Sequence, residues 1–224
     1  ASSSPTSCAL ASNNDATNAR THSGTPKLLI AHTSDFHIFA DAPETSLVRP
    51  DIVQATRKVI ADIANFSPRI DAVMITGDLA DGGTAKDYAL VKDILSPIDV
   101  PVFAVPGNHD AREGFRVAFE DTLPFGPGPK LDYEAFCGDL RIIALDTLIE
   151  DQVTGGLDDS QIDWLAERLA ELTDRLTLVL MHHPAFPSTI TTLDQMALKD
   201  GHSKFEKLIA QYAGPLRILS GHIH

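Results

Sequence analysis

Short runs of apolar residues alternate along this chain with segments in which apolar positions recur every three or four residues. The short runs are rich in β-branched residues and bounded by turn residues, which predicts buried strands. They lie at 28–32, 71–76, 100–105, 140–146, 176–181 and 216–220, and a further run at 133–136 is placed to form a hairpin with 140–146. The amphipathic segments predict helices at 50–66, 84–95, 111–121, 158–172 and 202–212. Strands that alternate with helices in this way are typical of an α/β domain.

Two segments lack such a pattern. Residues 1–26 are rich in Ala, Ser, Thr and Asn and carry too little apolar surface to offset the cost of ordering, which predicts a disordered tail before a domain at 27–224. The stretch 185–201 shows no clear periodicity, and we interpret it as a candidate lid or dimer contact, with a loop packed on its own domain as the alternative. The chain stops directly after a polar cluster at His224, so we expect a longer C-terminal part to be missing.

The composition fits one globular domain and excludes some partners. The chain has 224 residues, of which 43% are hydrophobic and 22% charged, and a formal net charge of −13. This charge argues against broad binding to nucleic acid or anionic lipid. No apolar run approaches the ~20 residues of a membrane span.

The cysteine content bears on the compartment. The two cysteines, Cys8 and Cys137, cannot form a disulfide framework, so a reducing compartment is favoured. We therefore expect a cytoplasmic protein, while the start at Ala1 leaves a removed leader open.

Polar, metal-binding side chains follow most of the predicted buried strands. Gly107 allows a sharp turn after the strand at 100–105 and presents three polar residues at once. Other strands end in the same manner, and the carboxyl edge of the sheet is where α/β proteins place their sites. The residues concerned are Asp35, His37, Asp78, Asn108, His109, His182, His183, His222 and His224. One such histidine would be uninformative, but so many at strand ends are hard to assign to packing, and they predict a metal site.

The spacing and type of these residues indicate which metals would bind. In extended backbone, residues i and i+2 project to the same side, so Asp35 with His37, and His222 with His224, are expected to offer paired ligands. Asp78 has two carboxylate oxygens and is able to bridge two ions. Nitrogen and oxygen ligands without thiolate suit Mn, Fe or Zn, and Cys137 lies outside the set.

Taken in order, these motifs resemble the signature of the calcineurin-like metallophosphoesterases. The motifs are Asp35-x-His37, Gly77-Asp78, Gly107-Asn108-His109-Asp110, His182-His183-Pro184 and Gly221-His222-x-His224, and they cover residues 28–224. The segments His182-His183-Pro184 and Gly156-Leu157 through Trp164-Leu165 are most similar to the bacterial class III cyclic-nucleotide phosphodiesterase and glycerophosphodiesterase branch. The resemblance implies a four-layer αββα sandwich with two mixed β-sheets flanked by helices.

The resemblance also implies a site with two divalent ions. Asp35, His37, Asp78 and His224 would hold the first ion, and Asp78, Asn108, His182 and His222 the second. A hydroxide that bridges the two ions would attack the phosphorus of a cyclic nucleotide of the 3′,5′-cAMP type or of another small phosphodiester. Asn108 and His109 would also bind the substrate.

Residues near the predicted ligands receive supporting or structural roles. The resemblance implies that His109 is not a ligand but stabilises charge or protonates the leaving group. Asp110 is a candidate catalytic residue that would orient His109, with a helix N-cap as an equally open alternative. His183 is a candidate support for the ligand set, Asp146 is expected to be a turn or cap residue, and His32 is expected to be structural.

Several alternatives remain open at this point. A phosphomonoesterase or another metal-dependent phosphatase would use the same metals, and a non-catalytic metal-binding scaffold is the less favoured alternative from a different class. The expected partners are a small phosphodiester or nucleotide substrate and, as an assembly, a possible homodimer. Nucleic acid is not an expected partner.

Overall fold

The structure, a computed structural model, describes residues 28–41, 46–171 and 174–224. The first sheet contains three parallel strands in the order β1 (Ile30–Thr33), β2 (Ala72–Ile75) and β3 (Val102–Ala104). The second sheet has the order β4 (Tyr133–Cys137), β5 (Leu140–Ala144), β7 (Thr177–Leu180) and β9 (Leu216–Leu219). In this second sheet β4 is antiparallel to β5, and the other pairs are parallel.

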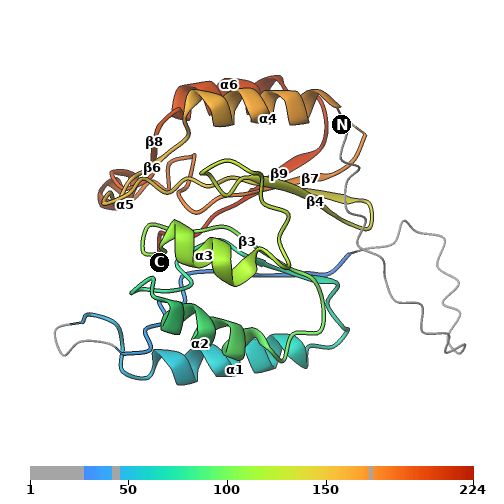
Figure 1. The fold of residues 1–224 in the computed structure, drawn as a ribbon. Helices are drawn as coiled ribbons and strands as arrows, with labels where there is room; N and C mark the ends of the chain where they lie inside the picture. The colour runs from blue at the N-terminus through green and yellow to red at the C-terminus, as the bar shows by residue number, and fades with distance from the viewer. Residues whose placement is uncertain (1–27, 42–45, 172–173) are drawn as a thin grey trace, which may run out of the picture.

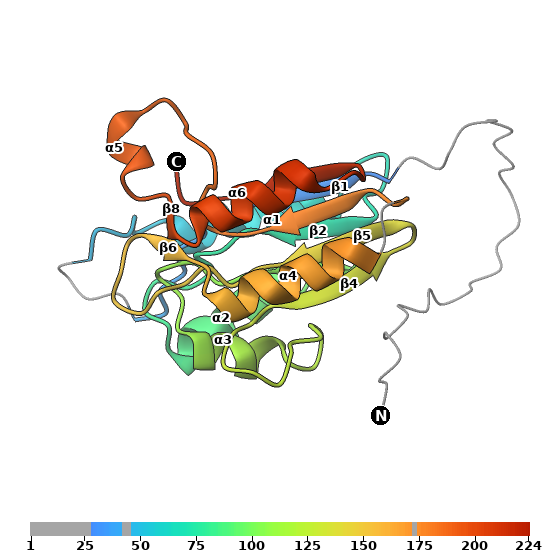
Figure 2. The same cartoon turned by 90° about the horizontal axis from the view of Figure 1, so that it is seen from above.

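Helices cover the outer faces of the two sheets, which gives four layers (Figure 1). Helices α1 (Ile52–Ala64) and α2 (Ala85–Leu95) flank the first sheet, and α3 (Arg112–Phe119) lies beside α2. Helices α4 (Asp159–Glu171) and α6 (His202–Gln211) cover the second sheet, as the view from above also shows (Figure 2). The predicted sandwich is confirmed, with the detail that the described strands of the first sheet are all parallel rather than mixed.

The alternation of side chains along each strand builds two separate cores. Ile142 and Leu178 face the first sheet and join the larger cluster, which also contains the buried side chains of β2 and β3. Their neighbours Ile143 and Val179 point the other way and pack under α4 and α6. Because both faces of β5 and β7 are covered, every residue of these strands is buried, and all but Arg141 and Thr177 are apolar.

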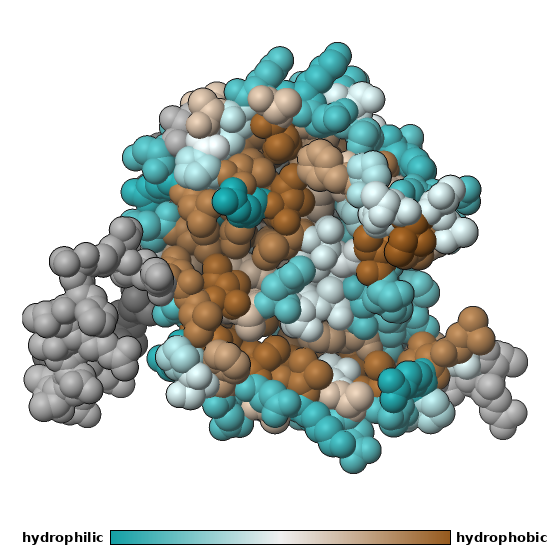
Figure 3. Space-filling model, turned by 180° about the vertical axis from the view of Figure 1, so that it is seen from behind, coloured by the Kyte–Doolittle hydropathy of each residue, from teal (hydrophilic) through white to brown (hydrophobic). Residues whose placement is uncertain are grey.

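The outermost strands on one side of the sandwich are less buried. No residue of β1 or β9 is fully buried, whereas every residue of β2, β5 and β7 is. Figure 3 shows apolar side chains reaching the surface on the back of the molecule, the side on which the β1 edge lies.

Most predicted element boundaries agree with the structure to within a few residues. Thr84 caps α2 as predicted, and its side chain and that of Asp87 form a reciprocal capping box. The hairpin of β4 and β5 is confirmed. The predicted start of α1 at Pro50 is two residues early, because the helix begins at Ile52.

The stretch 185–201 contains structure that the sequence pattern does not reveal. Helix α5 (Thr191–Asp194) is followed by β8 (Leu198–Asp200), which pairs in parallel with β6 (Gly155–Gly156). Among the described residues no helix is both long and apolar enough to cross a membrane. The predicted tail at 1–26 and Cys8 lie outside the described residues, as does Leu172 at the end of the predicted fourth helix.

Candidate metal centre

The predicted site residues lie in the loops that follow five strands. Asp35 and His37 follow β1, Asp78 follows β2, and Asn108 and His109 follow β3. The second sheet contributes His182 and His183 after β7, and His222 and His224 after β9. Because β1, β2 and β3 are mutually parallel, as are β7 and β9, each group of loops emerges at one edge of its sheet.

The loops adopt an unusual backbone at the site residues themselves. Asp35, His37, Asp78 and His222 have positive φ angles of 58°, 47°, 51° and 73°. A side chain in this region costs on the order of 1 kcal/mol or more, so the fold must hold each residue there. Such residues gather at functional sites, and here they direct side chains from separate strands toward one place.

Hydrogen bonds between loops maintain this backbone. Asp35 N–H donates to the Gly77 carbonyl at 3.0 Å, and His37 N–H donates to the Asp78 carbonyl at 2.9 Å. The expectation that Asp35 and His37 converge because their backbone is extended is therefore wrong. Left-handed turns, stabilised by the neighbouring loop, bring them together instead.

One group of polar atoms surrounds the Nε2 atom of His182. Asn108 Oδ1 and His222 Nδ1 each lie 3.1 Å from it, and Asp78 Oδ2 lies 3.3 Å from it. The other ring nitrogen, Nδ1, lies 2.7 Å from the carbonyl oxygen of Thr76, to which it donates its hydrogen in the neutral ring. In that tautomer Nε2 presents a lone pair to three other acceptor-capable atoms, an arrangement that a cation would satisfy.

A second group shares Asp78 with the first. Its oxygen Oδ2 lies 3.6 Å from His37 Nε2, and His224 Nε2 lies 4.0 Å from Asp35 Oδ1. The rings of His37 and His224 have centroids 5.6 Å apart. The ligand-type atoms of Asp35, His37 and His224 lie within 4.8 Å of one another.

The donor set fits divalent metal ions. His37 Nε2, which faces Asp78, is buried and has no hydrogen-bond partner among the described residues, although its ring belongs to a group able to hold an ion. All donors are imidazole nitrogens, carboxylate oxygens or an amide oxygen, which favours Mn, Fe or Zn over ions that need thiolates. Cys137 Sγ lies near the carbonyl of Asp71, which precedes β2 and is therefore at the other end of the sheet.

Two titratable groups of the centre support each other's charged form. Burial raises the pKa of Asp78, but the hydrogen bond and charge of His182 outweigh it and hold this pKa well below the usual range. Burial lowers the pKa of His182, and the carboxylate of Asp78 more than reverses this, so that the pKa is raised. A carboxylate that stays ionised is the form that binds metal.

Small residues permit the close approach of these loops. A Cβ atom on Gly107 would lie 2.1 Å from Asp78 Oδ1, and one on Gly77 would lie 2.4 Å from His182 Nδ1. Neither position has room for a side chain, and Gly77 also has a φ of 99°. The glycines that precede Asp78 and Asn108 are therefore part of the site.

Next to the predicted ligands, His109 contacts an acid that the sequence analysis did not single out. His109 Nδ1 lies 2.7 Å from Asp81 Oδ1, and His37 Nδ1 lies 3.1 Å from the same oxygen. The side chain of His109 is 45% exposed, so the ring is open to a substrate. The only sequence signal for Asp81 is its place three residues after Asp78. In a loop this spacing does not determine where the side chain points.

Asp110 does not act as a helix cap, because the N-cap residue of α3 is Ala111 and makes no side-chain cap bond. Its buried carboxylate accepts hydrogen bonds from the backbone N–H groups of Leu79, Ala80 and Gly107, and from the Tyr88 hydroxyl. Burial raises the pKa of Asp110 to about 6, while the backbone hydrogen bonds oppose this shift. Asp110 thus joins the loops that carry Asp78 and Asn108, and it supports His109 only through the backbone.

Each of the remaining singled-out residues makes at least one polar side-chain contact, and two of them, His183 and Asp146, are buried. His183 has Nδ1 2.8 Å from Thr147 Oγ1, and burial, followed by the charges of His182 and His222, lowers its pKa to about 2. Asp146 accepts a hydrogen bond from the Leu148 N–H, as expected of a turn residue, and it also forms a buried ion pair with Arg112. His32 is exposed, and its Nε2 lies 2.9 Å from Thr76 Oγ1.

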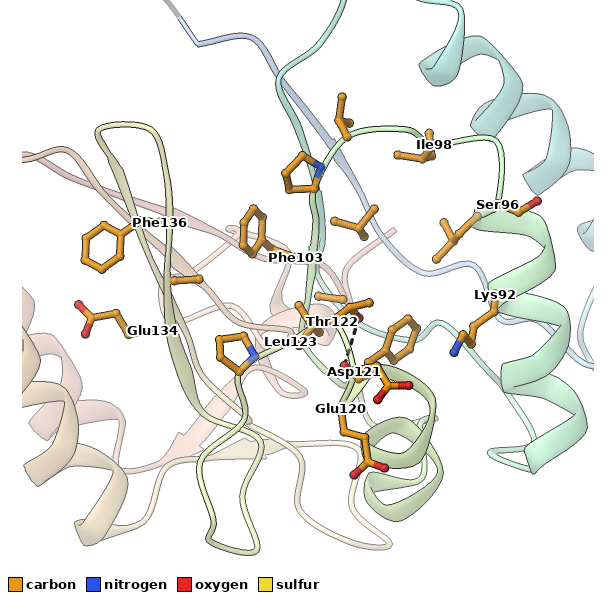
Figure 4. Close-up of a pocket in the computed structure, with 18 residues that line it drawn as sticks. Lys92, Ser96, Ile98, Phe103, Glu120, Asp121, Thr122, Leu123, Glu134 and Phe136 are labelled. Atoms are coloured by element: carbon orange, nitrogen blue, oxygen red, sulfur yellow. Dashed lines mark hydrogen bonds between the residues drawn. The ribbon is translucent and has the colours of Figure 1, made fainter. Parts of the chain in front are cut away.

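Two cavities differ in their chemistry. A cavity of about 580 Å³ opens beside the centre and is lined by Asp35 and His224. A larger cavity of about 850 Å³ lies at the β3 and β4 edges, where Phe103, Leu123 and Phe136 line it (Figure 4). The lining of the larger cavity includes no histidine, so only the smaller cavity adjoins the metal-binding side chains.

Comparison with known proteins relates this chain to phosphoesterases. The family model described as calcineurin-like phosphoesterase matches residues 28–224. A probable glycerophosphodiester phosphodiesterase of Arcobacter nitrofigilis is 32% identical over 88% of this chain and 72% of its own length. A 3′,5′-cyclic adenosine monophosphate phosphodiesterase of Pseudomonas aeruginosa is 31% identical over 91% of this chain and 73% of its own.

Among solved structures, the purple acid phosphatase from yellow lupin seeds is similar in fold. The TM-score is 0.60 at 19% identity, and the match covers 87% of this chain and 37% of that one. At this identity the similarity concerns the fold alone.

Proposed function

This chain belongs to the calcineurin-like phosphoesterase family, and from that premise we propose that it is a dinuclear-metal phosphodiesterase for cyclic nucleotides or small phosphodiesters. The single observation that carries the proposal is the convergence of nitrogen and oxygen donors from five strand ends onto two adjoining groups. Asp78 belongs to both groups, as a bridging ligand must.

We assign Asp35, His37, Asp78 and His224 to one ion, and Asp78, Asn108, His182 and His222 to the other. When bound, divalent ions would polarise the phosphoryl oxygens and make a water molecule acidic enough to attack near neutral pH. The positive charge of two such ions is larger than the negative charge of the two ligand carboxylates, Asp35 and Asp78. The pocket is then positive within an acidic protein, which suits a phosphodiester monoanion.

The residues of the chain perform the remaining tasks. Asp81 Oδ1 lies 2.7 Å from His109 Nδ1, so its carboxylate would orient the ring and leave Nε2 free to face the substrate. His109 Nε2 would hydrogen-bond the leaving-group oxygen and donate a proton to it as the ester bond breaks. Asn108 would orient the phosphoryl group through its amide, beside the ring that supplies the proton.

The similarity of this chain to a glycerophosphodiesterase and to a cyclic AMP phosphodiesterase favours a diester over a monoester substrate. The proposal is tested by turnover of a panel of cyclic nucleotides, glycerophosphodiesters and phosphomonoesters with Mn²⁺, Fe²⁺ or Zn²⁺ supplied singly. We expect the diesters to be turned over with the higher kcat/KM. A consistent preference for monoesters would replace the proposal with a phosphomonoesterase.

The identity of the metals and their number belong to this proposal. A cytoplasmic location, a homodimeric assembly and the lack of a nucleic-acid partner remain predictions from the sequence.

A further inference from the structure

The proposed mechanism leaves one buried histidine next to the centre without a task. His183 has no exposed surface, and burying its polar ring costs free energy unless the ring is hydrogen-bonded. Its Nδ1 atom lies 2.8 Å from Thr147 Oγ1, and its backbone N–H donates to the same oxygen at 3.4 Å. Thr147 follows β5, so the hydrogen bond fixes the His183 ring from the neighbouring strand end.

The fixed ring packs against two of the proposed ligands. Its centroid lies 4.7 Å from that of His222 at an interplanar angle of 54°, and 4.9 Å from that of His182 at 85°. A nitrogen atom of each of the three rings lies within 4.8 Å of the others. His222 needs such support, because its φ of 73° lies in the left-handed region, where a side chain is strained.

The small sheet of β6 and β8 closes on the other side of the His183 ring. A Cβ atom on Gly155 would lie 2.3 Å from His183 Cγ, so only glycine lets the β6 backbone lie against the ring. Gly155 N–H donates to the Ala197 carbonyl of the 185–201 stretch, and Gly156 N–H donates to the Thr147 carbonyl at 3.0 Å. The ring is therefore enclosed by Thr147, Gly155 and the two ligands.

We propose that His183 is a positioning residue for the second metal ion. Its ring, fixed by Thr147 and Gly155, holds the His222 ring with Nδ1 3.1 Å from His182 Nε2. The inference rests on the proposed function for the existence of that ion. In this proposal the β6–β8 sheet has a structural role, because it encloses the His183 ring. Groups that orient a metal ligand commonly change metal affinity by about 10–100-fold when they are removed.

The test measures metal binding rather than turnover. Mn²⁺ is titrated calorimetrically into metal-free wild type and into the His183→Ala, His183→Asn, Thr147→Val and Gly155→Ala variants. Electron paramagnetic resonance then reports whether two Mn²⁺ ions are magnetically coupled. Gly156→Ala is the matched control, because it changes the same strand but its Cβ would meet Ile149 and Asp200 rather than His183. Thermal unfolding monitored by circular dichroism reports whether each variant folds.

We expect the second Mn²⁺ to bind about 10–100-fold more weakly in His183→Ala, with the first unchanged and the coupled signal lost at subsaturating metal. His183→Asn retains a polar group near Thr147, so its affinity for the second Mn²⁺ should fall less than that of His183→Ala. Thr147→Val and Gly155→Ala should also bind the second Mn²⁺ more weakly than wild type. Gly156→Ala should resemble wild type.

Two results would overturn the inference while leaving the proposed function intact. If all variants that fold bind two ions as wild type does, His183 positions nothing. If only the His183 variants lose the second ion, the residue is itself a ligand rather than a support held by Thr147 and Gly155. A wild-type protein that binds no metal would instead refute the proposed function.

Discussion

Among the single residues, His109 is the proposed general acid and is not one of the proposed metal ligands. It lies beside His37, with ring centroids 4.7 Å apart, and its side chain is partly exposed. Replacing His109 with Ala should lower kcat by roughly 10²-fold or more, the usual scale for a general acid, while both metals stay bound. Steady-state kinetics and metal analysis of the same sample check this. Loss of a metal ion would mean that His109 is a ligand.

Asp81 should affect the rate through His109. Asp81→Asn removes the charge that holds the ring at 2.7 Å, and we expect kcat to fall by about 10-fold or more with little change in KM. The double variant with His109→Ala should then be no slower than His109→Ala alone, because the acid acts only through the ring. An additive loss in the double variant would show that Asp81 acts through His37 instead.

The charge state of His182 makes metal binding depend on pH. In the metal-free protein Asp78 raises the pKa of His182 above its ordinary value, so this ring is still protonated at pH values where a free histidine is neutral. A metal ion must displace that proton. Mn²⁺ affinity should therefore rise with pH through and above the ordinary histidine range, with proton release seen when calorimetry is repeated in buffers of different ionisation enthalpy. Binding without proton release would contradict this.

The ligand types and their strand-end positions could be predicted from the sequence, but their supporting contacts could not. Asp81 and Thr147 follow strands as other polar residues do, and nothing in their spacing shows that one faces His109 and the other His183. Such contacts depend on loop conformations that bring distant segments together. Asp110 is a further example. Its place before a helix predicts a helix cap, but its carboxylate accepts hydrogen bonds from the loop after β2 instead.

At the scale of elements, buried strands and amphipathic helices are predictable because their periodicity reflects which face is covered. The β6–β8 sheet was missed because two- and three-residue strands have no measurable period. The convergence of Asp35 and His37 was anticipated for the wrong reason. Local spacing suggested an extended backbone, whereas hydrogen bonds from the 77–79 loop stabilise positive φ angles.

The turn after β3 provides a test at this scale. Gly107→Ala would place a Cβ atom 2.1 Å from Asp78 Oδ1, so the loop must move away from the carboxylate that both ions share. We expect both Mn²⁺ ions to bind at least 10-fold more weakly while far-ultraviolet circular dichroism stays unchanged. Gly128→Ala is the control, since nothing lies within 4 Å of its Cβ position. Unchanged metal affinity in Gly107→Ala would show that the turn tolerates a side chain.

At the scale of the whole molecule, the two sheets bring loops from both halves of the chain to one centre. Asp78 after β2 lies 3.3 Å from His182 after β7, so the contact depends on the packing of one sheet on the other. Bound metal should therefore stabilise the entire sandwich, because only the folded protein assembles the ligands. In the proposed site the ions, rather than lysine or arginine side chains, would supply the positive charge.

The proposed two-metal phosphodiesterase is tested by a metal titration of chelator-treated protein, with bound metal and hydrolysis of bis(p-nitrophenyl) phosphate recorded on the same samples. We expect metal-free protein to be folded and inactive, and two Mn²⁺, Fe²⁺ or Zn²⁺ ions to bind per chain. Activity on this diester should reappear with the bound metal and exceed that on p-nitrophenyl phosphate. A folded protein that binds no such ion, or that hydrolyses the diester equally well without metal, would contradict the proposal.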